Sequence, residues 1–367
     1  MRRFPRPTAL TACLALVLAA MACGGEDEAG KPAAERPAES GAADLGAVKG
    51  YLLDHTTRLV ADTGRLRAEA EAYHAMAEGA RFDYDALLAR DREAVGASVE
   101  RLQASYRAAN PSYERMEGVV AGVPELADYD VTIDAGGDAS EPDSAVPFTL
   151  KTRQGRTFKQ PGNFFFLVET AVFGTEERFA AKGVEPDLDG DGRVAFGEAV
   201  PDADFLLTAT RDFETTAKEL DAAARAWTPT EADAFNALVV MTPTMSEYFE
   251  AWKSSRFVAG EAATETAFAG ASRLQDIADI LAGLEVIYAN VEPRIAEASG
   301  EQAEQTQRSL DRLQTYAARL RDEERDGRRF TPEEAETLGT DAQEQAEAIA
   351  GQVSQAAGKL GIELQEA

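Results

Sequence analysis

Residues 272–293 read SRLQDIADILAGLEVIYANVEP, and this stretch decides which fold class the sequence favours. Its apolar side chains recur at spacings of three and four, at Leu274, Ile277, Leu281, Leu284 and Ile287. Residues at this spacing lie on one face of a helix with about 3.6 residues per turn. The stretch therefore predicts a core helix. We expect Pro293 to end it, because proline cannot donate a backbone hydrogen bond.

The same periodicity marks other helices. One begins near residue 47 and is carried by Leu52, Thr56, Leu59, Thr63, Leu66, Ala70 and Tyr73. A second is carried by Leu88, Val95, Val99, Leu102 and Tyr106. We expect a third after Asn110-Pro111, with the asparagine as its cap and the proline at its first position. Two more are expected at capping boxes, Thr228-Pro229-Thr230-Glu231 and Thr331-Pro332-Glu333-Glu334.

Turn-rich segments interrupt this helical pattern. Residues 130–163 form one such segment, and we expect a small hairpin in it around Gln154-Gly155. With about eight to ten helices, the sequence predicts an all-α fold of two helical bundles, because a domain usually has ~100–200 residues. We assign residues 47–185 to the first bundle, including the loop insertion, and residues 199–360 to the second.

The first residues have the pattern of a secretory signal. In residues 1–23, MRRFPRPTALTACLALVLAAMAC, arginines precede an apolar run, and small residues precede Cys23. The end of the run resembles the lipobox of bacterial lipoproteins, which implies a lipoprotein signal peptide over 1–22 and an acylated Cys23. The alternative is soluble secretion after cleavage nearby. Residues 23–46 have almost no large apolar side chain and predict a disordered tether.

These features predict where the protein resides. Acyl chains on Cys23 would tether it to a lipid membrane without spanning it. The residue after this cysteine is Gly24 and not aspartate, which by the lipoprotein sorting pattern favours the outer membrane, facing the periplasm or the cell surface. The only other cysteine, Cys13, lies within the signal. A disulfide, a thiolate nucleophile and a zinc–thiolate cluster are therefore excluded from the mature chain.

The charge balance restricts the partners. The chain has 37 Lys+Arg against 65 Asp+Glu, and its formal net charge is −28 at pH 7. Nucleic acid is excluded as a partner, because binding it depends on neutralising phosphates with basic side chains. A cation or a basic protein is the easier inference, although a charge of this size also serves solubility alone.

A short acidic loop has the spacing of a calcium site. Residues 186–198 read PDLDGDGRVAFGE. An EF-hand loop takes oxygen ligands from positions 1, 3, 5, 7 and 12, with glycine at 6 and an aliphatic residue at 8. The ligands here would be Asp187, Asp189, Asp191, the carbonyl of Arg193, and Glu198, with Gly192 and Val194 in the other two positions.

This spacing predicts one calcium ion in a structural role. A single unpaired loop in an extracytoplasmic protein should bind weakly, with a dissociation constant on the order of 10⁻⁴–10⁻³ M. Pro186 and Pro201 limit the helices that flank an EF-hand loop, and Ala195 at position 9 leaves that ligand to a water. The alternative is a solvated acidic loop without an ion.

Three further segments resemble the imelysin-like family. Tyr113-Glu114 and Met116-Glu117 match a Tyr-Glu-x-Ile-Glu-Pro-like motif, and Asp130, Ile133 and Asp134 match a stretched Leu-Asp-x-x-Ile-Asp-like segment. The stretch 164–169 corresponds to the family's Gly-x-His-x-x-Glu signature. Glu169 is kept there, but Phe164 replaces the glycine and Phe166 the histidine. The resemblance extends over most of residues 47–295.

The resemblance implies a fold and a site. The family consists of periplasmic lipoproteins and secreted proteins once classed as peptidases, and it includes a component of a bacterial ferrous-iron uptake system. It implies two antiparallel helical bundles side by side, with any site between them. A ligand set of Glu117, Asp134 and Glu169 would be purely hard-oxygen, because no imidazole is present. The alternative is that Glu169 is a structural acid and the phenylalanine run belongs to the core.

Catalytic motifs are absent from the sequence. Its only histidines, His55 and His74, do not form His-Glu-x-x-His, and there is no Gly-x-Ser-x-Gly elbow, phosphate loop or dinucleotide fingerprint. The first hypothesis is therefore a non-enzymatic, calcium-binding lipoprotein on an imelysin-like scaffold. The second is an iron-uptake component that works with a membrane transport partner. A hydrolase comes last.

Overall fold

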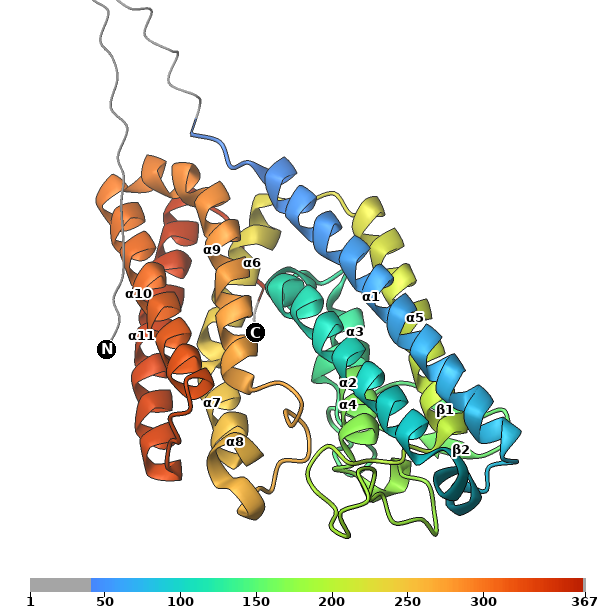
Figure 1. Cartoon of the computed structure of the whole chain (residues 1–367). Coiled ribbons are helices and arrows are strands. Elements are labelled where there is room, and N and C mark those ends of the chain that lie inside the picture. Colours follow the sequence, from blue (N-terminus) through green and yellow to red (C-terminus); the bar gives the residue numbers. More distant parts are fainter. Residues whose placement is uncertain (1–40, 366–367) are drawn as a thin grey trace, which may run out of the picture. The chain divides into compact units, whose positions relative to one another are not determined.

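The computed structural model describes residues 41–365, so the signal peptide, Cys23 and most of the expected tether lie outside the described residues. The residues from Gly41 onward form one compact unit. The chain is all-α apart from one small hairpin, which confirms the predicted fold class (Figure 1). The major helices are α1 (Leu45–Gly79), α2 (Tyr84–Gly122), α4 (Phe164–Phe173), α5 (Ala203–Ala226), α6 (Glu231–Met241), α7 (Met245–Ser254), α9 (Arg273–Ala298), α10 (Gly300–Arg325) and α11 (Pro332–Leu360).

Short elements connect them. They are α3 (Ala127–Asp130), η1 (Val131–Ala135), η2 (Glu177–Phe179), η3 (Thr242–Thr244), α8 (Arg256–Ala259) and η4 (Gly260–Ala262). The strands β1 (Thr149–Lys151) and β2 (Thr157–Lys159) pair antiparallel, with Leu150 opposite Phe158. Their connection contains Gly155 at a φ of 84°, a conformation that glycine adopts without steric cost. The hairpin expected around Gln154-Gly155 is thus confirmed.

The first helical group is α1, α2, α4 and α5. In Figure 1, α1 lies along both α2 and α5. The residues that predicted α1 form its inner face, because Leu52, Leu59, Leu66 and Tyr73 are all fully buried. Our boundary at residue 199 assigns the helix over 203–226 to the second bundle, whereas α5 packs against α1.

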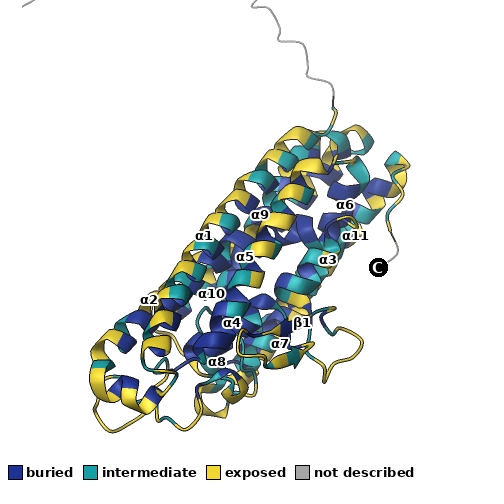
Figure 2. Ribbon diagram, turned by 90° about the vertical axis from the view of Figure 1, so that its right-hand side faces the viewer, coloured by how far each residue is buried: buried dark blue, intermediate teal, exposed yellow. Residues whose placement is uncertain are grey.

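The second group is α6, α7, α9, α10 and α11. Here α9 packs on α10, and α11 packs on α7 and α10. The capping box before α11 is present. The Thr331 side chain accepts a hydrogen bond from the Glu334 N–H, and the Glu334 carboxylate accepts one from the Thr331 N–H. The box before α6 differs from the prediction, because the cap is Thr230 with Asp233. Figure 2 shows that buried residues follow the inward faces of the helices and exposed residues the outward faces.

Two prolines do not mark helix boundaries as the sequence predicted, Pro111 at the start of a helix and Pro293 at the end of one. The helix α2 runs through Pro111, and α9 runs through Pro293. A proline inside a helix costs about 3 kcal/mol. On both sides of each proline, however, the helix buries large side chains, such as Tyr106 and Tyr113 in α2. Packing therefore outweighs the local cost. Asn110 is free of a capping role and donates instead to Glu114 Oε1 at 2.8 Å.

The contact between the two groups depends on glycine. A Cβ atom built on Gly283 of α9 would lie 2.1 Å from the carbonyl oxygen of Arg115 on α2. A Cβ on Gly122 of α2 would lie 2.4 Å from the Cα atom of Ala237 on α6. Both distances are far below van der Waals contact. The backbones of α2, α6 and α9 therefore approach as closely as they do only because these positions carry no side chain.

We expect Gly283→Ala to destabilise the fold by about 1–3 kcal/mol, because the new methyl group must push α9 away from α2. The matched control is Gly351→Ala on α11, where an added Cβ meets nothing within 4 Å. The control should be neutral or up to ~1 kcal/mol more stable, since alanine is the better helix former. Chemical denaturation measures both free energies of unfolding. Equal stability of the two variants would contradict the close-contact argument.

Candidate metal centre

Buried carboxylates gather where α2, η1 and α9 meet. Glu114 and Glu117 are three residues apart on α2, so they lie on the same face of the helix. Glu114, Glu117 and Asp134 of η1 each place a carboxylate oxygen within 4.8 Å of the other two. Asp276 of α9 and Asp130 of α3 are buried beside them. We call these five residues the carboxylate cluster.

One guanidinium lies inside the cluster. Arg273 is held between the rings of Tyr248 and Phe268, each with its centroid 4.3 Å away. Arg273 Nη1 donates to Asp276 Oδ2 at 3.2 Å. The other approaches are longer, with 3.6 Å to Glu114 Oε2 and 3.9 Å to Asp134 Oδ2. One positive charge thus faces five carboxyl groups, and ionisation of all five would leave the site strongly negative.

Hydrogen bonds satisfy only part of the cluster. The Tyr248 hydroxyl donates to Glu117 Oε1 at 2.7 Å, and the Tyr113 hydroxyl donates to Asp130 Oδ1 at 2.6 Å. Within residues 41–365, Glu114 Oε2, Glu117 Oε2 and Asp276 Oδ1 are buried without a donor. A buried acceptor without a partner costs about 1–3 kcal/mol. Such oxygens require a proton or a cation, and the oxygen donors present fit a hard metal ion.

Burial also shifts the acidity of the cluster. Desolvation, with the charges of Asp134 and Asp130, raises the pKa of Glu117 to about 8. Desolvation raises the pKa of Asp130 to about 7 and that of Asp276 to about 6. Without a cation, the cluster therefore holds protons near neutral pH. A cation that enters must displace those protons, so binding at this site is linked to pH.

A cavity borders the cluster at Asp134. Its volume is about 460 Å³, and its lining includes Tyr106, Asn110, Asp134, Glu169 and Phe268. The end of η1 and the residues after it, 135–138, form one wall, and residues 264–268, which precede α9, form another. The cluster is thus buried by the surrounding helices but borders a space large enough for an ion and its water molecules.

Glu169 lies outside the three-carboxylate group. Its Oε2 accepts from the N–H of Phe268 at 2.7 Å, and its Oε1 accepts from Ala269 at 3.1 Å and Gly270 at 2.9 Å. Both oxygens therefore hold the segment that leads into α9. Phe166, at the position of the family's histidine, packs edge-on against Phe179 with centroids 6.1 Å apart. The geometry matches the structural alternative for Glu169 and the phenylalanine run.

Sequence reasoning did not assign Arg273, Asp276 and Tyr248 to the site. A signal for two of them exists in residues 272–293. Arg273 and Asp276 are three residues apart on a helix whose other inward positions are apolar, yet both are buried. Polar residues on a buried face are the informative exceptions in a core. Tyr248 has a mostly apolar side chain, like an ordinary core residue. The sequence therefore did not indicate that it belongs to the site.

The acidic loop forms a second group of oxygens. Asp187, Asp189 and Asp191 each place a carboxylate oxygen within 4.8 Å of the other two. Glu198 folds back over the loop, because its Oε1 accepts from the N–H of Leu188 at 2.8 Å and its Oε2 from Ala195 at 2.6 Å. Glu198 therefore holds the backbone of the loop, while the group of converging carboxylates consists of the three aspartates.

The surroundings of this loop differ from those of an EF-hand. The segment just before it is not helical, and α5 begins only at Ala203. Val194 at position 8 is 49% exposed, because no second loop pairs with it. Arg92 of α2 lies 3.2 Å from Asp187 Oδ2, and Gln103 donates to Gly197 O at 2.7 Å. The loop thus connects α4 to α5 and is fastened to α2.

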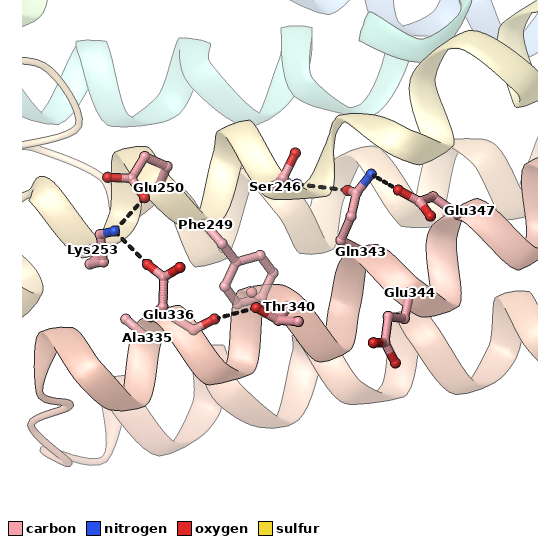
Figure 3. Close-up of a pocket in the computed structure, with 11 residues that line it drawn as sticks. Ser246, Phe249, Glu250, Lys253, Ala335, Glu336, Thr340, Gln343, Glu344 and Glu347 are labelled. Atoms are coloured by element: carbon pink, nitrogen blue, oxygen red, sulfur yellow. Dashed lines mark hydrogen bonds and ion pairs between the residues drawn. The ribbon is translucent and has the colours of Figure 1, made fainter.

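A surface groove between α7 and α11 also contains several acids (Figure 3). Its volume is about 350 Å³, and Phe249 lies at its base against Gly339. Glu336 is 63% exposed and pairs with Lys253 at 2.6 Å, with Glu250 on the other side of the same ammonium group. Exposed pairs of this kind contribute about 0–1 kcal/mol. The groove is a packing feature between two helices.

The histidines lie apart from the carboxylate cluster. The ring of His55 packs on Tyr51 with centroids 4.5 Å apart. His74 Nε2 lies 4.0 Å from Asp204 Oδ1, and its ring meets Phe82 edge-on.

Among the described helices, none combines the length and the apolar character that crossing a bilayer requires.

Comparison with known proteins assigns the family. The family model for imelysin (Peptidase_M75) matches residues 165–354, more than half of the chain. The matched segment contains Glu169, Arg273 and Asp276, and it begins after the cluster residues of α2 and η1. No curated protein matches the sequence. The chain belongs to the imelysin family, whose members are extracytoplasmic proteins.

Proposed function

We propose that this protein is a non-enzymatic, extracytoplasmic binding protein for a hard metal cation, with the carboxylate cluster as its binding site. One observation carries the proposal. Glu114, Glu117 and Asp134 converge within 4.8 Å, and two of them keep a buried oxygen that no described residue satisfies. A cation supplies what those oxygens lack. The proposal of a binding protein also fits the separation of both histidines from the cluster.

Iron is the cargo that family membership favours, because imelysin-family domains are associated with iron uptake. The donors here are carboxylate oxygens, which suit hard cations better than copper or zinc. Phe166 supplies no imidazole to widen that preference. Arg273 offsets only one of the five carboxylates when all are ionised, so enough negative charge remains to accommodate a divalent or trivalent ion.

Substituting the cluster should weaken cation binding. We expect Glu117→Gln/Asp134→Asn to weaken binding by at least about tenfold, because two converging oxygens lose their charge. Calorimetry with Mn²⁺, an oxygen-preferring probe, and metal analysis after equilibration with iron measure the effect. Both use a background of Asp187→Ala/Glu198→Gln, so that the acidic loop does not contribute. The control is Glu250→Gln/Glu336→Gln in the α7–α11 groove (Figure 3), which removes the same charge at the surface.

The same titration has a definite pH dependence. Glu117 and Asp130, whose pKa values are raised to about 8 and about 7, carry protons at pH 6 and lose them toward pH 8. Affinity should therefore rise from pH 6 to pH 8, with release of protons on binding. A wild-type protein that binds no ion, or a cluster variant that binds as well as the control, would reject the site.

We also propose that the loop over 187–198 binds calcium in a structural role. The convergence of its three aspartates and the position of Glu198 support this. Binding to the folded state alone raises stability by RT ln(1 + [Ca²⁺]/Kd). With a dissociation constant on the order of 10⁻⁴–10⁻³ M, 10 mM calcium should raise the melting temperature by a few degrees. Asp187→Ala/Glu198→Gln should remove this shift, and identical wild-type melting curves with and without calcium would refute the site.

The proposed location is the outer membrane, through acyl chains on Cys23. The lipobox-like residues before Cys23 and the extracytoplasmic character of the family support it. In a Gram-negative host, Cys23→Ala should shift the protein from the membrane pellet to the soluble fraction, because the thiol that carries the lipid is gone. Fractionation and immunoblotting measure this shift, with Cys13→Ala as the matched control. A Cys23→Ala protein that still sediments with membranes would contradict lipid anchoring.

A further inference from the structure

A second cavity lies on the other side of Asn110 from the proposed cation site, and it has the opposite charge. Its volume is about 630 Å³, within the range of small-molecule sites. It is formed by α2, by the start of α9 and by the end of α10 with the turn that follows. Asn110 lines both cavities. Five arginines line it, namely Arg107, Arg115, Arg321, Arg325 and Arg329.

This concentration of arginine stands out in an acidic chain. The protein has 65 acidic residues against 37 basic ones, yet the cavity lining has only two acids, Asp279 and Glu324. Both acids already have partners. Asp279 Oδ1 pairs with Arg115 Nε at 2.9 Å, and Glu324 Oε1 accepts from the Trp252 indole at 2.8 Å. The lining therefore keeps an excess of positive charge.

Three of the arginines have no carboxylate within ion-pair distance in the part of the chain that the structure describes. They are Arg107, Arg325 and Arg329. Arg107 Nε donates to the carbonyl of Gly270 at 2.9 Å, which fixes its guanidinium at the rim. The cavity thus gathers guanidinium groups that no described acid neutralises, and like charges in one cavity favour an anion between them.

We propose that this arginine-lined cavity binds a small organic anion with two or more carboxylate or phosphate groups. The planar guanidinium presents paired N–H donors that match carboxylate and phosphate oxygens. Between the arginines, Pro111, Phe257 and Ala271 give the lining apolar surface for a short carbon skeleton. The proposal is independent of the cation site, because none of the five arginines belongs to the carboxylate cluster.

The test is calorimetric titration of the purified full chain, in calcium-free buffer, with propane-1,2,3-tricarboxylate and with inorganic phosphate. We expect saturable binding of at least one anion. Binding of the tricarboxylate alone indicates an organic acid, and comparable binding of phosphate indicates a phosphate ester. Arg325→Gln/Arg329→Gln should weaken binding by at least about tenfold, because two charge-assisted partners are lost. Both arginines are exposed, so the fold should tolerate the change.

The matched control is Arg308→Gln/Arg319→Gln, which removes the same charge from α10 outside the cavity. The control residues form i,i+4 ion pairs with Glu304 and Glu323, and Arg319 also lies over the Tyr316 ring. The control should bind as the wild type does, and melting curves verify that both variants fold. Absence of saturable binding in the wild type, or an equal loss of affinity in the cavity variant and the control, would overturn the proposal.

Discussion

The structure depends on how closely α2 approaches α9. At Gly283 and Gly122 the backbones of α2, α6 and α9 come closer than any side chain would permit. The same approach encloses Glu114 and Glu117 of α2 with Asp276 of α9. A wider separation would admit water and let the carboxyl groups keep ordinary acidity. Close packing of the helix backbones thus buries the carboxyl groups. Buried carboxyl groups need either protons or a cation to offset their charge.

Arg273 offsets part of the negative charge of the carboxylate cluster but not all of it. Its guanidinium is fixed between Tyr248 and Phe268, and it donates a hydrogen bond to Asp276 alone among the cluster acids. Removing one partner from a buried charge pair is costly, because the other charge then has no compensation. The arginine therefore stabilises the buried cluster, while several carboxylate oxygens of the cluster remain without a hydrogen-bond donor among the described residues. Glu169 supports this arrangement because it accepts backbone hydrogen bonds from the segment before α9.

Cavities of opposite charge lie on the two sides of Asn110. The carboxylate side is lined by Asp134 and Glu169, and the arginine side by Arg107 and Arg115. The composition does not reveal this difference in charge between the two cavities, since a net charge of −28 suggests a uniformly negative surface. Local electrostatics depends on which residues the fold assembles and not on the total. The fold therefore separates a cavity lined by carboxylates from a cavity lined by arginines.

The sequence alone determined the fold class and most helix faces, because periodic burial is a local property. Leu52, Leu59 and Leu66 predicted the inner face of α1, and Thr331 with Glu334 predicted the start of α11. The acidic loop was also readable, since the three aspartates that converge in it are close together in the sequence. Only tertiary structure decided that α2 and α9 continue through their prolines, because the decisive packing comes from distant segments. For the same reason, only the fold could bring Asp134 to Glu117, pair Arg273 with Asp276 and turn Glu169 toward the backbone.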